Sequence, residues 1–572
     1  MTQVSVPLLR PEIRDRLIPD GGTTGQVAVK SAGPGAEWAD PESVVAGSLD
    51  DIVATEEQAS DLDENTASNV NLMTPLRVIS ALKAFEPYDP RWFGCDGSDG
   101  AESKASANVA GLNDLFNTVQ ERSRDYDDLP PGPWPTPTTP VEGRPWYNLI
   151  GREVNGQGAV LALNEPVDLK GAFGLNLKNL SLIAVDDGWS SGDAVLINSS
   201  TSGTDFAPAN TAGMMLENIL VNCNGKASGI DLIGGNRWGT IKHCRVFGFG
   251  GVDGGVGINV RTGLECELLY NHVYGSDLAY TSPPEATNNA IGINCDQGDC
   301  ELIGNKVFRS ATGVRVGNVS GVLLAHNHLH AFDNSVSRPS IFIDRDSATG
   351  HIMVHDNYID SSVIWVRGPR NVEIIDNRQL CLEISGTPAP AYMIRLIARE
   401  PNETLMQFHA RGNRAQIPLI PPSPGATAYT PLTLQETGGN SFSGLQFCEV
   451  GDWKLMSGTN GGTGTLARTT YGQLEVNVAA TDFDGSNDTF IDLTSFLLLP
   501  NAPSPATFIV VSATGRSTAS GSAVSFPTGW AYDRTTGRLR MRFAAAFDGF
   551  ITLTYKWAFQ DVRAVSASSP PS

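Results

Sequence analysis

Leu268-Leu269-Tyr270-Asn271 returns as Leu302-Ile303-Gly304-Asn305, as Leu324-Ala325-His326-Asn327 and as Ile374-Ile375-Asp376-Asn377. Each copy has an apolar residue, two variable positions and an Asn. A second phrase, such as Gly257-Ile258-Asn259-Val260, alternates with the first. Self-similarity at intervals of this kind indicates a solenoid. The apolar residues alternate with period two, which indicates strands rather than helices. We therefore predict an all-β chain built on a parallel β-helix.

Size and composition restrict the class of protein further. With 572 residues the chain exceeds one compact core, and its 60 Gly and 35 Pro suit an all-β protein with many turns. The formal net charge of -22 disfavours a nucleic-acid partner, since phosphate binding needs clustered Lys and Arg. No stretch approaches the length and apolar character of a membrane-spanning segment, so we expect no membrane insertion.

Cysteine and histidine are placed in a way that favours packing over metal binding. Cys266, Cys295 and Cys300 fall at inward-facing strand positions, where we expect buried free thiols in a chain made in a reducing cytoplasm. Seven of the eight His lie between His243 and His355, and the alternation puts them on either side of a turn. They are not expected to converge on a metal ion. We predict no metal and no cofactor.

Changes in composition divide the chain into six segments. We expect an N-terminal region over 1–88, a β-helix entry segment over 89–157, the β-helix over 158–416, a Pro-rich linker over 417–436, a C-terminal β-sandwich-like domain over 437–562 and a tail over 563–572. In the entry segment, Val109, Leu112, Phe116 and Val119 predict an amphipathic helix from about 105 to 122. Such a helix would cover the unpaired edge of the first coil.

Three stretches carry a resemblance to a known family. Residues 21–27 read Gly-Gly-Thr-Thr-Gly-Gln-Val and residues 73–78 read Met-Thr-Pro-Leu-Arg-Val. Both resemble stretches in the part of bacteriophage tailspike and tail fibre proteins that lies nearest the virion. Trp92-Phe93-Gly94-Cys95-Asp96-Gly97 resembles the entry segment of pectate-lyase-like right-handed β-helices. It departs from that pattern because Cys95 replaces an Ala and the usual aspartate doublet is missing.

The resemblance implies a phage tailspike with a right-handed parallel β-helix. Such a protein is made in the cytoplasm of the host bacterium and is carried on the virion as a homotrimer. Its N-terminal region attaches to tail or baseplate proteins, and its C-terminal domain holds the trimer together or binds sugar. The implied receptor is a bacterial surface polysaccharide, which is a capsule, an exopolysaccharide or an O-antigen.

Superposition of the repeats separates core positions from surface positions. Aliphatic residues such as Ile258 and Val260 point inward, and the repeated Asn is expected to form an internal amide ladder that satisfies backbone groups at a turn. Two rows point outward. The first contains Asp231, Asn259, Asn294, Arg315, Phe342 and Trp365, with Arg395 as a continuation, and the second contains Arg261, Asp296, Gly317, Asp344 and Arg367.

Phe342 beside Trp365 predicts an exposed apolar patch on the outer surface. Sugar rings stack on such patches, while polar neighbours bind hydroxyls and acidic substituents. An interface between subunits would favour the same residue types, so both interpretations remain open. The expected substrate-binding residues are Asp231, Asn294, Arg315, Phe342, Trp365 and Arg367.

Two pairs of carboxylates are candidates for catalysis. Asp296 and Asp344 lie two rungs apart, roughly 9.5 Å between backbones at ~4.8 Å per rung. Inverting glycosidases separate their carboxyls by ~6.5 to 9.5 Å, and Gly317 between the two would leave room for a water. The alternative pair is Glu267 and Glu301, direct neighbours whose spacing is nearer the ~5 to 5.5 Å of a retaining enzyme.

Three functions follow for a protein of this class. The first is a glycoside hydrolase in which one of Asp296 and Asp344 protonates the glycosidic oxygen and the other activates water. The second is a receptor-binding spike with no catalytic activity. The third is a polysaccharide lyase, whose chemistry commonly uses calcium and a basic residue. Fold alone does not decide among them.

Overall fold

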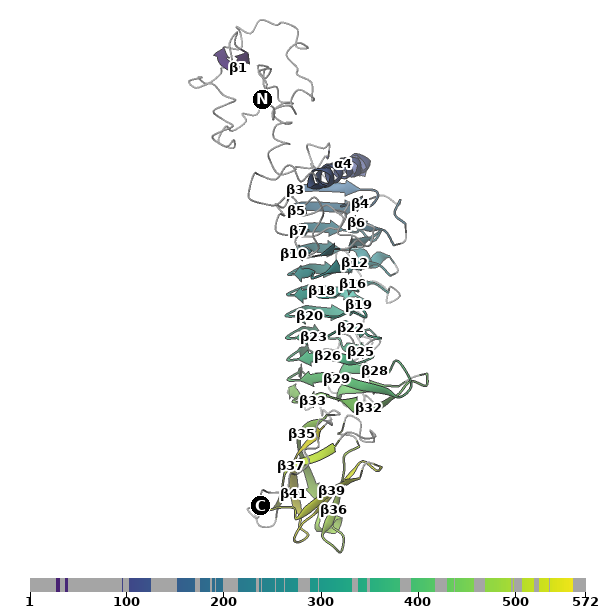
Figure 1. Ribbon diagram of the computed structural model, residues 1–572, viewed down its shortest axis with the longest axis vertical. Coiled ribbons are helices and arrows are strands. Elements are labelled where there is room, and N and C mark those ends of the chain that lie inside the picture. Colours follow the sequence, from purple (N-terminus) through teal and green to yellow (C-terminus); the bar gives the residue numbers. More distant parts are fainter. Residues whose placement is uncertain are drawn as a thin grey trace, which may run out of the picture.

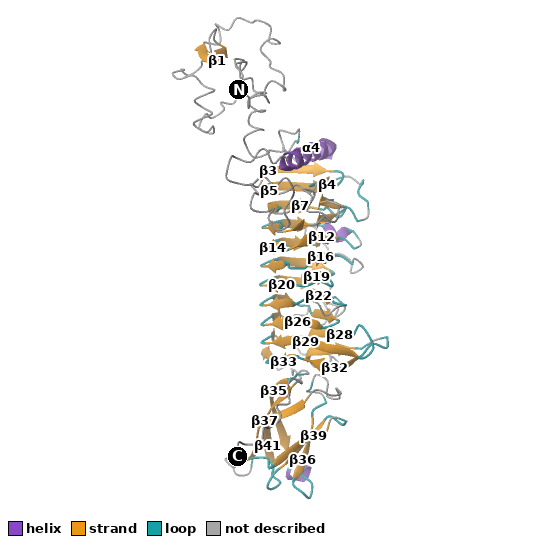
Figure 2. Ribbon diagram, in the orientation of Figure 1, coloured by secondary structure: helices purple, strands orange, loops and turns teal. Residues whose placement is uncertain are grey.

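The computed structural model describes residues 27–30, 36–39, 95, 102–124, 152–198, 214–275, 289–380, 392–416, 430–456, 469–497 and 507–558, with short gaps inside several of these ranges. Figure 1 shows a long stack of short strands, with one helix beside its N-terminal end and a separate β domain at its C-terminal end. Strands dominate throughout, as Figure 2 shows by colour. The sequence also predicts a helix with Thr74 as its N-cap and a Pro-rich surface loop over 128–140, and both segments lie outside the described residues.

Three parallel sheets form the stack, and we number them by their order in each coil. Sheet 1 consists of β4 (Val167–Asp168), β6 (Ala194–Asn198), β8 (Ser228–Leu232), β12 (Val256–Val260), β16 (Ile291–Cys295), β19 (Thr312–Val316), β22 (Ile341–Asp344), β25 (Ile364–Arg367), β28 (Tyr392–Ile397) and β31 (Thr430–Gln435). Sheet 2 contains β10 (Thr240–Lys242), β14 (Glu267–Leu269), β17 (Glu301–Ile303), β20 (Val322–Ala325), β23 (Ile352–His355), β26 (Arg370–Ile375), β32 (Phe442–Gln446) and β33 (Glu449–Gly451).

Sheet 3 completes each coil. It contains β11 (Arg245–Phe247), β15 (His272–Tyr274), β18 (Lys306–Ser310), β21 (His328–Ala331), β24 (Tyr358–Asp360), β27 (Arg378–Leu380), β30 (Arg414–Gln416) and β34 (Lys454–Met456). The longer strands β3 (Arg152–Leu163), β5 (Leu175–Ala184), β7 (Met215–Asn222) and β29 (Glu403–Arg411) also pair in these stacks, and β9 (Asn236–Arg237) pairs with β13 (Gly263–Leu264).

Pairing between coils is parallel and in register, which confirms the predicted parallel β-helix. In sheet 1, Ile258 of β12 pairs with Ile230 in the preceding coil and with Ile293 in the following coil. In sheet 2, Glu267 of β14 pairs with Glu301 of β17. Because successive side chains alternate between faces, the register places every second residue of each strand in one inward column. A right-handed coil is the sense that parallel crossovers adopt in nearly all proteins.

The repeated Asn forms the amide ladder that the sequence predicts. In the corner between sheets 2 and 3, Asn271, Asn305, Asn327, Asn357, Asn377 and Asn413 are stacked and almost completely buried. From Asn305 onward, each carboxamide oxygen accepts from the Asn of the preceding coil, at 2.9–3.1 Å from its side-chain nitrogen, whereas Asn271 Oδ1 accepts from the Cys244 backbone nitrogen at 2.9 Å. The residue just before the Asn is in the left-handed region, as for Tyr270 (φ 56°) and Gly304 (φ 69°). That backbone conformation makes the sharp corner, and the Asn satisfies its polar groups.

The core is a set of aliphatic columns. Ile258, Val260, Ile293 and Ile343 are fully buried, as are nearly all other aliphatic residues that sheet 1 points inward, while Leu434 in the last strand is partly buried. Each buried aliphatic side chain contributes about 1.5 to 3 kcal/mol relative to an exposed one. The seven described cysteines are buried, and Cys381 lies outside the described residues. Burial raises the pKa of Cys244 to about 12, so this thiol is neutral and inert.

A helix covers the first coil, as predicted. α4 (Ala105–Arg124) follows the short 3-10 helix η6 (Glu102–Lys104) and lies next to β3. Val109 and Leu112 are buried, together with Leu115, which the sequence prediction did not include. The side chains of Phe116 and Val119 lie outside the described residues. The Asn108 side chain donates to the Ala162 carbonyl at 3.1 Å, which ties the helix to β3.

The described strands place the ends of the β-helix differently from the prediction. The first strand begins at Arg152 rather than 158, and another coil follows residue 416. β31, expected to be linker, pairs with β28, and β34 pairs with β30. This coil escaped detection because the corner phrase reads Val450-Gly451-Asp452-Trp453, with Trp453 in the place of the ladder Asn. Asp452 keeps the left-handed corner conformation (φ 53°).

Two antiparallel sheets form the C-terminal domain. One contains β35 (Tyr471–Val478), β41 (Gly549–Ala558), β37 (Thr507–Ser517) and β38 (Val524–Ser525), and the other contains β36 (Asp488–Asp492), β40 (Arg538–Arg542) and β39 (Gly529–Asp533). A short 3-10 helix, η10 (Ala480–Asp482), lies between β35 and β36, and η9 (Phe249–Gly251) lies in the β-helix. A Cβ on Gly515 of β37 would approach Phe543, just beyond β40, to 3.3 Å, so the two sheets face each other.

Within residues 1–88, the structure describes one hairpin of two strands. β1 (Val27–Lys30) and β2 (Ala36–Ala39) pair as an antiparallel hairpin. Among the described residues, no helix is long and apolar enough to cross a membrane.

Candidate functional site

The outward face of sheet 1 carries the candidate site. Its first row is in register over consecutive rungs and contains Asp231, Asn259, Asn294, Arg315, Phe342, Trp365 and Arg395. Asp344 pairs directly with Arg367 in the second row. Alternation within each strand therefore brings the predicted binding residues Asp231, Asn294, Arg315, Phe342, Trp365 and Arg367 to one face, as we expected.

Phe342 and Trp365 form the aromatic part of the site. Their ring centroids are 6.2 Å apart with the planes at 88°, an edge-to-face pair. The guanidinium of Arg367 lies 5.3 Å above the Phe342 ring, and that of Arg395 lies 5.3 Å above the Trp365 ring. Both aromatic residues are half-buried. The expected apolar patch is therefore a mixed surface of rings and cations.

Asp344 is held as a carboxylate by two arginines. Arg367 Nε donates to its Oδ1 at 2.8 Å, a second Arg367 nitrogen pairs with Oδ2, and Arg399 Nη1 donates to Oδ1 at 2.9 Å. Burial by itself would raise the pKa of Asp344. The hydrogen bond and charge of Arg367, together with the charges of Arg399 and Arg315, outweigh burial and lower this pKa below its usual range. Asp344 is therefore ionised at neutral pH, which excludes it as a proton donor.

Arg399 is a member of the site that sequence reasoning missed. It follows β28 and reaches back across the chain to Asp344, from which it is 55 positions distant in sequence. Its backbone nitrogen is also fixed, since it donates to the buried Glu403 carboxylate at 2.6 Å. Arg399 stands outside the repeated phrase, so superposition of the repeats could not assign it to a face.

Asp296 leans over the glycine of the next coil. A Cβ on Gly317 would lie 2.1 Å from Asp296 Oδ1, so the carboxylate occupies the space that we expected to be free for a water. Arg315 Nη1 donates to both carboxylate oxygens, at 3.2 and 3.3 Å, and Asn294 donates to Oδ2 at 2.8 Å. Only a residue without a Cβ at position 317 leaves room for this position of the Asp296 carboxylate.

Asp231 is a second acid with an unusual environment. It is buried, and Arg261 Nη2 donates to its Oδ2 at 2.6 Å. Its Oδ1 is buried and forms no hydrogen bond within the described part of the chain. Burial raises the pKa of Asp231, and the charge and hydrogen bond of Arg261 offset only part of this increase. The pKa values of Asp231 and Asp344 are therefore shifted in opposite directions, but the two residues lie four rungs apart, roughly 19 Å at ~4.8 Å per rung, which is too far for one acid–base pair.

The alternative pair lies on sheet 2. Glu267 and Glu301 are direct neighbours in register, and both are exposed. Thr240 Oγ1 donates to Glu267 Oε2 at 3.1 Å. The sequence suggests Lys242 or Lys306 as cations that could offset these two stacked charges, but Lys242 instead forms an ion pair with Glu217 at 3.1 Å. The sequence also suggests that an insert over 276–289 walls a groove on this side, and all of this insert except residue 289 lies outside the described residues.

The histidines are distributed over corners and two sheets. His351 and His355 each lie 3.5 Å from Glu373, while five others lie on or beside sheet 3. Within the described residues, no group of three or more His, Cys, Asp or Glu side chains is arranged to hold a metal ion.

Comparison with known proteins gives similarities of low sequence identity. No family model and no curated protein matches this sequence. Among solved structures, the Dettilon tailspike protein is 12% identical, with 81% of this chain and 92% of that chain covered and a TM-score of 0.38. A variant tailspike of Escherichia coli bacteriophage HK620, solved with a hexasaccharide, is 12% identical over 89% of this chain and 99% of that chain (TM-score 0.35). A DFA-IIIase variant from Arthrobacter chlorophenolicus is 14% identical, covering 58% and 83% (TM-score 0.30). The strand register described above, rather than these similarities, establishes the parallel β-helix.

Proposed function

We propose that this chain is a bacteriophage tailspike that binds a bacterial surface polysaccharide along sheet 1 and hydrolyses it. The observation that supports the proposal most is the outward face of sheet 1, where a half-buried aromatic pair stands beside arginine-held carboxylates. Aromatic rings suit sugar faces, and guanidinium groups suit hydroxyl and carboxylate substituents. The tailspike assignment rests on the sequence resemblance of the N-terminal and entry segments.

The proposed reaction is hydrolysis with inversion at the anomeric carbon. Asp344, whose lowered pKa keeps it ionised, takes a proton from water as the water oxygen attacks the anomeric carbon. The glycosidic C–O bond breaks, and Asp296, which must act here in its protonated form, gives that proton to the leaving oxygen. Arg315 contacts Asp296 and contributes to the field at Asp344, so it holds the two groups in a fixed relation.

A receptor-binding spike with no catalytic activity is the second candidate. The observation that favours it is the engagement of both Asp344 carboxylate oxygens by Arg367 and Arg399. A carboxylate with this many donors holds its charge strongly and is a weak base. In either case we propose a homotrimer on the virion that attaches to the phage tail through residues 1–88.

The test is release of new reducing ends from capsular polysaccharide or lipopolysaccharide of a sensitive host. Asp344→Asn and Asp296→Asn should each reduce the rate by ~10²- to 10⁴-fold, the usual contribution of a general acid or base. Glu217→Gln, at a carboxylate that pairs with Lys242 away from sheet 1, should keep the full rate.

Each other outcome identifies a different function. Full cleavage by both Asp variants would contradict the assignment, and loss of activity in Glu267→Gln or Glu301→Gln would move catalysis to sheet 2. Adsorption by the wild-type protein with no new reducing ends would support the receptor-binding spike. Products that absorb in the near ultraviolet would indicate a lyase.

A further inference from the structure

Sheet 3 carries a surface of different character from sheet 1. Over the four coils of β11, β15, β18 and β21, one outward row contains Arg245, His272, Lys306 and His328 in register. The row two residues further on contains Phe247, Tyr274, Phe308 and His330, and the adjoining corner contains His243, Tyr270, Gly304 and His326. We call these twelve positions the basic face.

The basic face has no carboxylate among its twelve positions, although the chain has a formal net charge of -22. Arg245 and Lys306 are exposed, and neither forms an ion pair with a carboxylate within the described part of the chain. Five of the eight histidines of the chain lie here, but burial lowers the pKa of His272, His328 and His330, so the positive charge comes from Arg245 and Lys306. The next coil ends the pattern, because Asp356 and Asp360 flank Tyr358. A positive surface confined to four coils of an acidic protein favours an anionic ligand.

The aromatic row walls this surface on one side. Phe247, Tyr274 and Phe308 are stacked face to face, with ring centroids 5.4 and 5.3 Å apart. Stacking occupies the ring faces and Phe247 is buried, so solvent meets ring edges of the half-buried Tyr274 and Phe308 rather than free platforms. Single-stranded nucleic acids bind by stacking their bases on free ring faces, so this arrangement disfavours them. It leaves charge and hydrogen bonding as the means of recognition.

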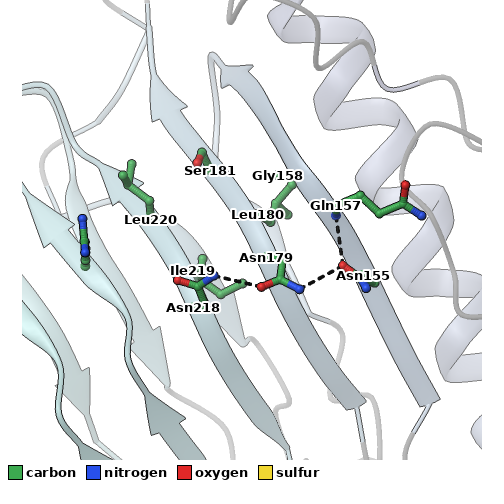
Figure 3. Close-up of a pocket in the computed structure, with 10 residues that line it drawn as sticks. Asn155, Gln157, Gly158, Asn179, Leu180, Ser181, Asn218, Ile219 and Leu220 are labelled. Carbon is green, nitrogen blue, oxygen red and sulfur yellow. Dashed lines mark hydrogen bonds between the residues drawn. The ribbon is translucent and has the colours of Figure 1, made fainter.

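A cavity adjoins the basic face at its N-terminal end. It has a volume of about 500 Å³, and Arg245 lines it together with Leu220 and Ser181 of the preceding two coils, which continue the same outward row. Figure 3 shows the carboxamides of Asn155, Asn179 and Asn218 in line across this cavity, linked by hydrogen bonds of 3.1 and 2.9 Å. Amides suit sugar hydroxyls, so cations and neutral polar groups are continuous along this side of the helix.

We propose that the basic face and its cavity bind a linear polysaccharide that bears carboxylate groups. The carboxylates pair with Arg245 and Lys306, two coils apart at roughly 9.5 Å, and the amides of the cavity bind hydroxyl groups of an adjoining sugar. This surface is separate from the sheet 1 row. The identification of the ligand as a glycan rests on the proposed function, whereas the charge of the ligand rests on sheet 3 itself.

A binding experiment can distinguish this ligand from two other occupants of the basic face. A second copy of this acidic chain has the required charge. If such a copy docked on the basic face, removal of the cations would change the mass of the assembly. A neutral polysaccharide would bind independently of salt. The probe is polygalacturonate, with its fully methyl-esterified form as the uncharged match, and binding is measured on the full chain by calorimetry.

Polygalacturonate should bind, and its affinity should fall as salt rises from about 50 mM to about 200 mM, because charge pairing is screened. The Arg245→Gln/Lys306→Gln variant should bind roughly tenfold more weakly, since an exposed charge pair contributes up to about fivefold. Lys242→Gln/Arg411→Gln removes the same charge from cations that already pair with Glu217 and Glu449, and should bind as the wild-type protein does.

Equal binding of the methyl ester, wild-type affinity in the Arg245→Gln/Lys306→Gln variant, or no binding of polygalacturonate at about 50 mM salt would overturn the proposal. A changed assembly mass in that variant, measured by light scattering, would overturn it in favour of a second copy. Trp365→Leu distinguishes this proposal from the proposed function. If Trp365→Leu abolishes binding of host polysaccharide and the sheet 3 variant has no effect, the proposed function stands and the basic face fails.

Discussion

Asn327 shows how one residue type holds every coil in register. Its Oδ1 accepts from the backbone and side-chain nitrogens of Asn305 at 2.9 and 3.0 Å. Its Nδ2 donates to Leu302 O at 2.8 Å and to Asn357 Oδ1 at 2.9 Å. A single carboxamide thus satisfies buried polar groups on both neighbouring coils, at a corner where the sheets cannot satisfy them.

Replacement of Asn327 by Leu should lower stability strongly. Each buried group that loses its partner costs about 1–3 kcal/mol, and several lose theirs at once. The thermal unfolding midpoint at a fixed scan rate measures the effect. His326→Asn is the matched control, because Asn tolerates the left-handed conformation of this exposed corner position (φ 57°). A midpoint for Asn327→Leu as high as that of the control would refute the ladder as a source of stability.

Gly317→Ala should reduce activity at the site while leaving the stability of the β-helix nearly unchanged. The new Cβ would displace the Asp296 carboxylate, the end of a flexible side chain, so stability should change by less than about 1 kcal/mol. Cleavage or binding of the host polysaccharide should fall, because Asp296 loses its position beside Arg315. Gly188→Ala, where a Cβ would make an ordinary 3.5 Å contact with Asn164 O, should alter neither property. Wild-type activity in Gly317→Ala would mean that the position of Asp296 is unimportant.

Strand alternation predicts which face a residue occupies, but not how its side chain is used. The sequence placed Asp296, Arg315 and Asp344 on the outer surface correctly, because period two fixes the direction of Cβ. It could not show that Asp296 turns over Gly317, since a rotamer depends on neighbouring charges. It also could not bring in Arg399, which lies after a strand and outside the repeat.

At the scale of elements, sheet 3 carries a histidine whose titration makes stability depend on pH. The pKa of His272 is below its ordinary 6.5, first because of burial and then because of the charges of Lys306 and Arg245. As pH falls through 6.5, the unfolded chain therefore takes up a proton at His272, whereas the folded chain takes up this proton only at lower pH. Stability contributed by this residue is present above the ordinary pKa and is lost as pH falls through it.

Replacement of His272 by Gln should reduce this pH dependence. The thermal midpoint of the wild-type protein should fall between about pH 7.5 and about pH 5.5, and the fall should be smaller in His272→Gln. His243→Gln, at an exposed corner position, should retain the fall seen in the wild-type protein. An equal fall in His272→Gln and wild type would show that the titration of His272 does not contribute.

The ends of the β-helix were the elements hardest to predict. A Pro-rich stretch, 417–425, suggested a linker, yet the chain returns to form β31 to β34. The corner survives without its Asn because the backbone conformation at Asp452 is kept. Repeat phrases identify internal coils well, whereas terminal coils carry exceptions such as Trp453, since they pack against something other than another coil.

At the scale of the whole molecule, the fold is a one-dimensional stack closed at both ends. Each coil contacts only its neighbours, so stability accumulates coil by coil. α4 covers the first coil, and the C-terminal β domain follows the last one, where β33 contacts β35. These closures remove open sheet edges that would otherwise pair with other chains. The outer surfaces of sheets 1 and 3 then remain as the two surfaces that we propose for binding.

The direct test of the central claim is a crystal structure of the full chain with an oligosaccharide of the host surface polysaccharide. We predict sugar rings against Phe342 and Trp365 on sheet 1, with hydroxyl or carboxylate groups within hydrogen-bond distance of Arg315 and Arg367. Burial of Phe342 and Trp365 against another protomer, with the sugar bound elsewhere, would contradict the account.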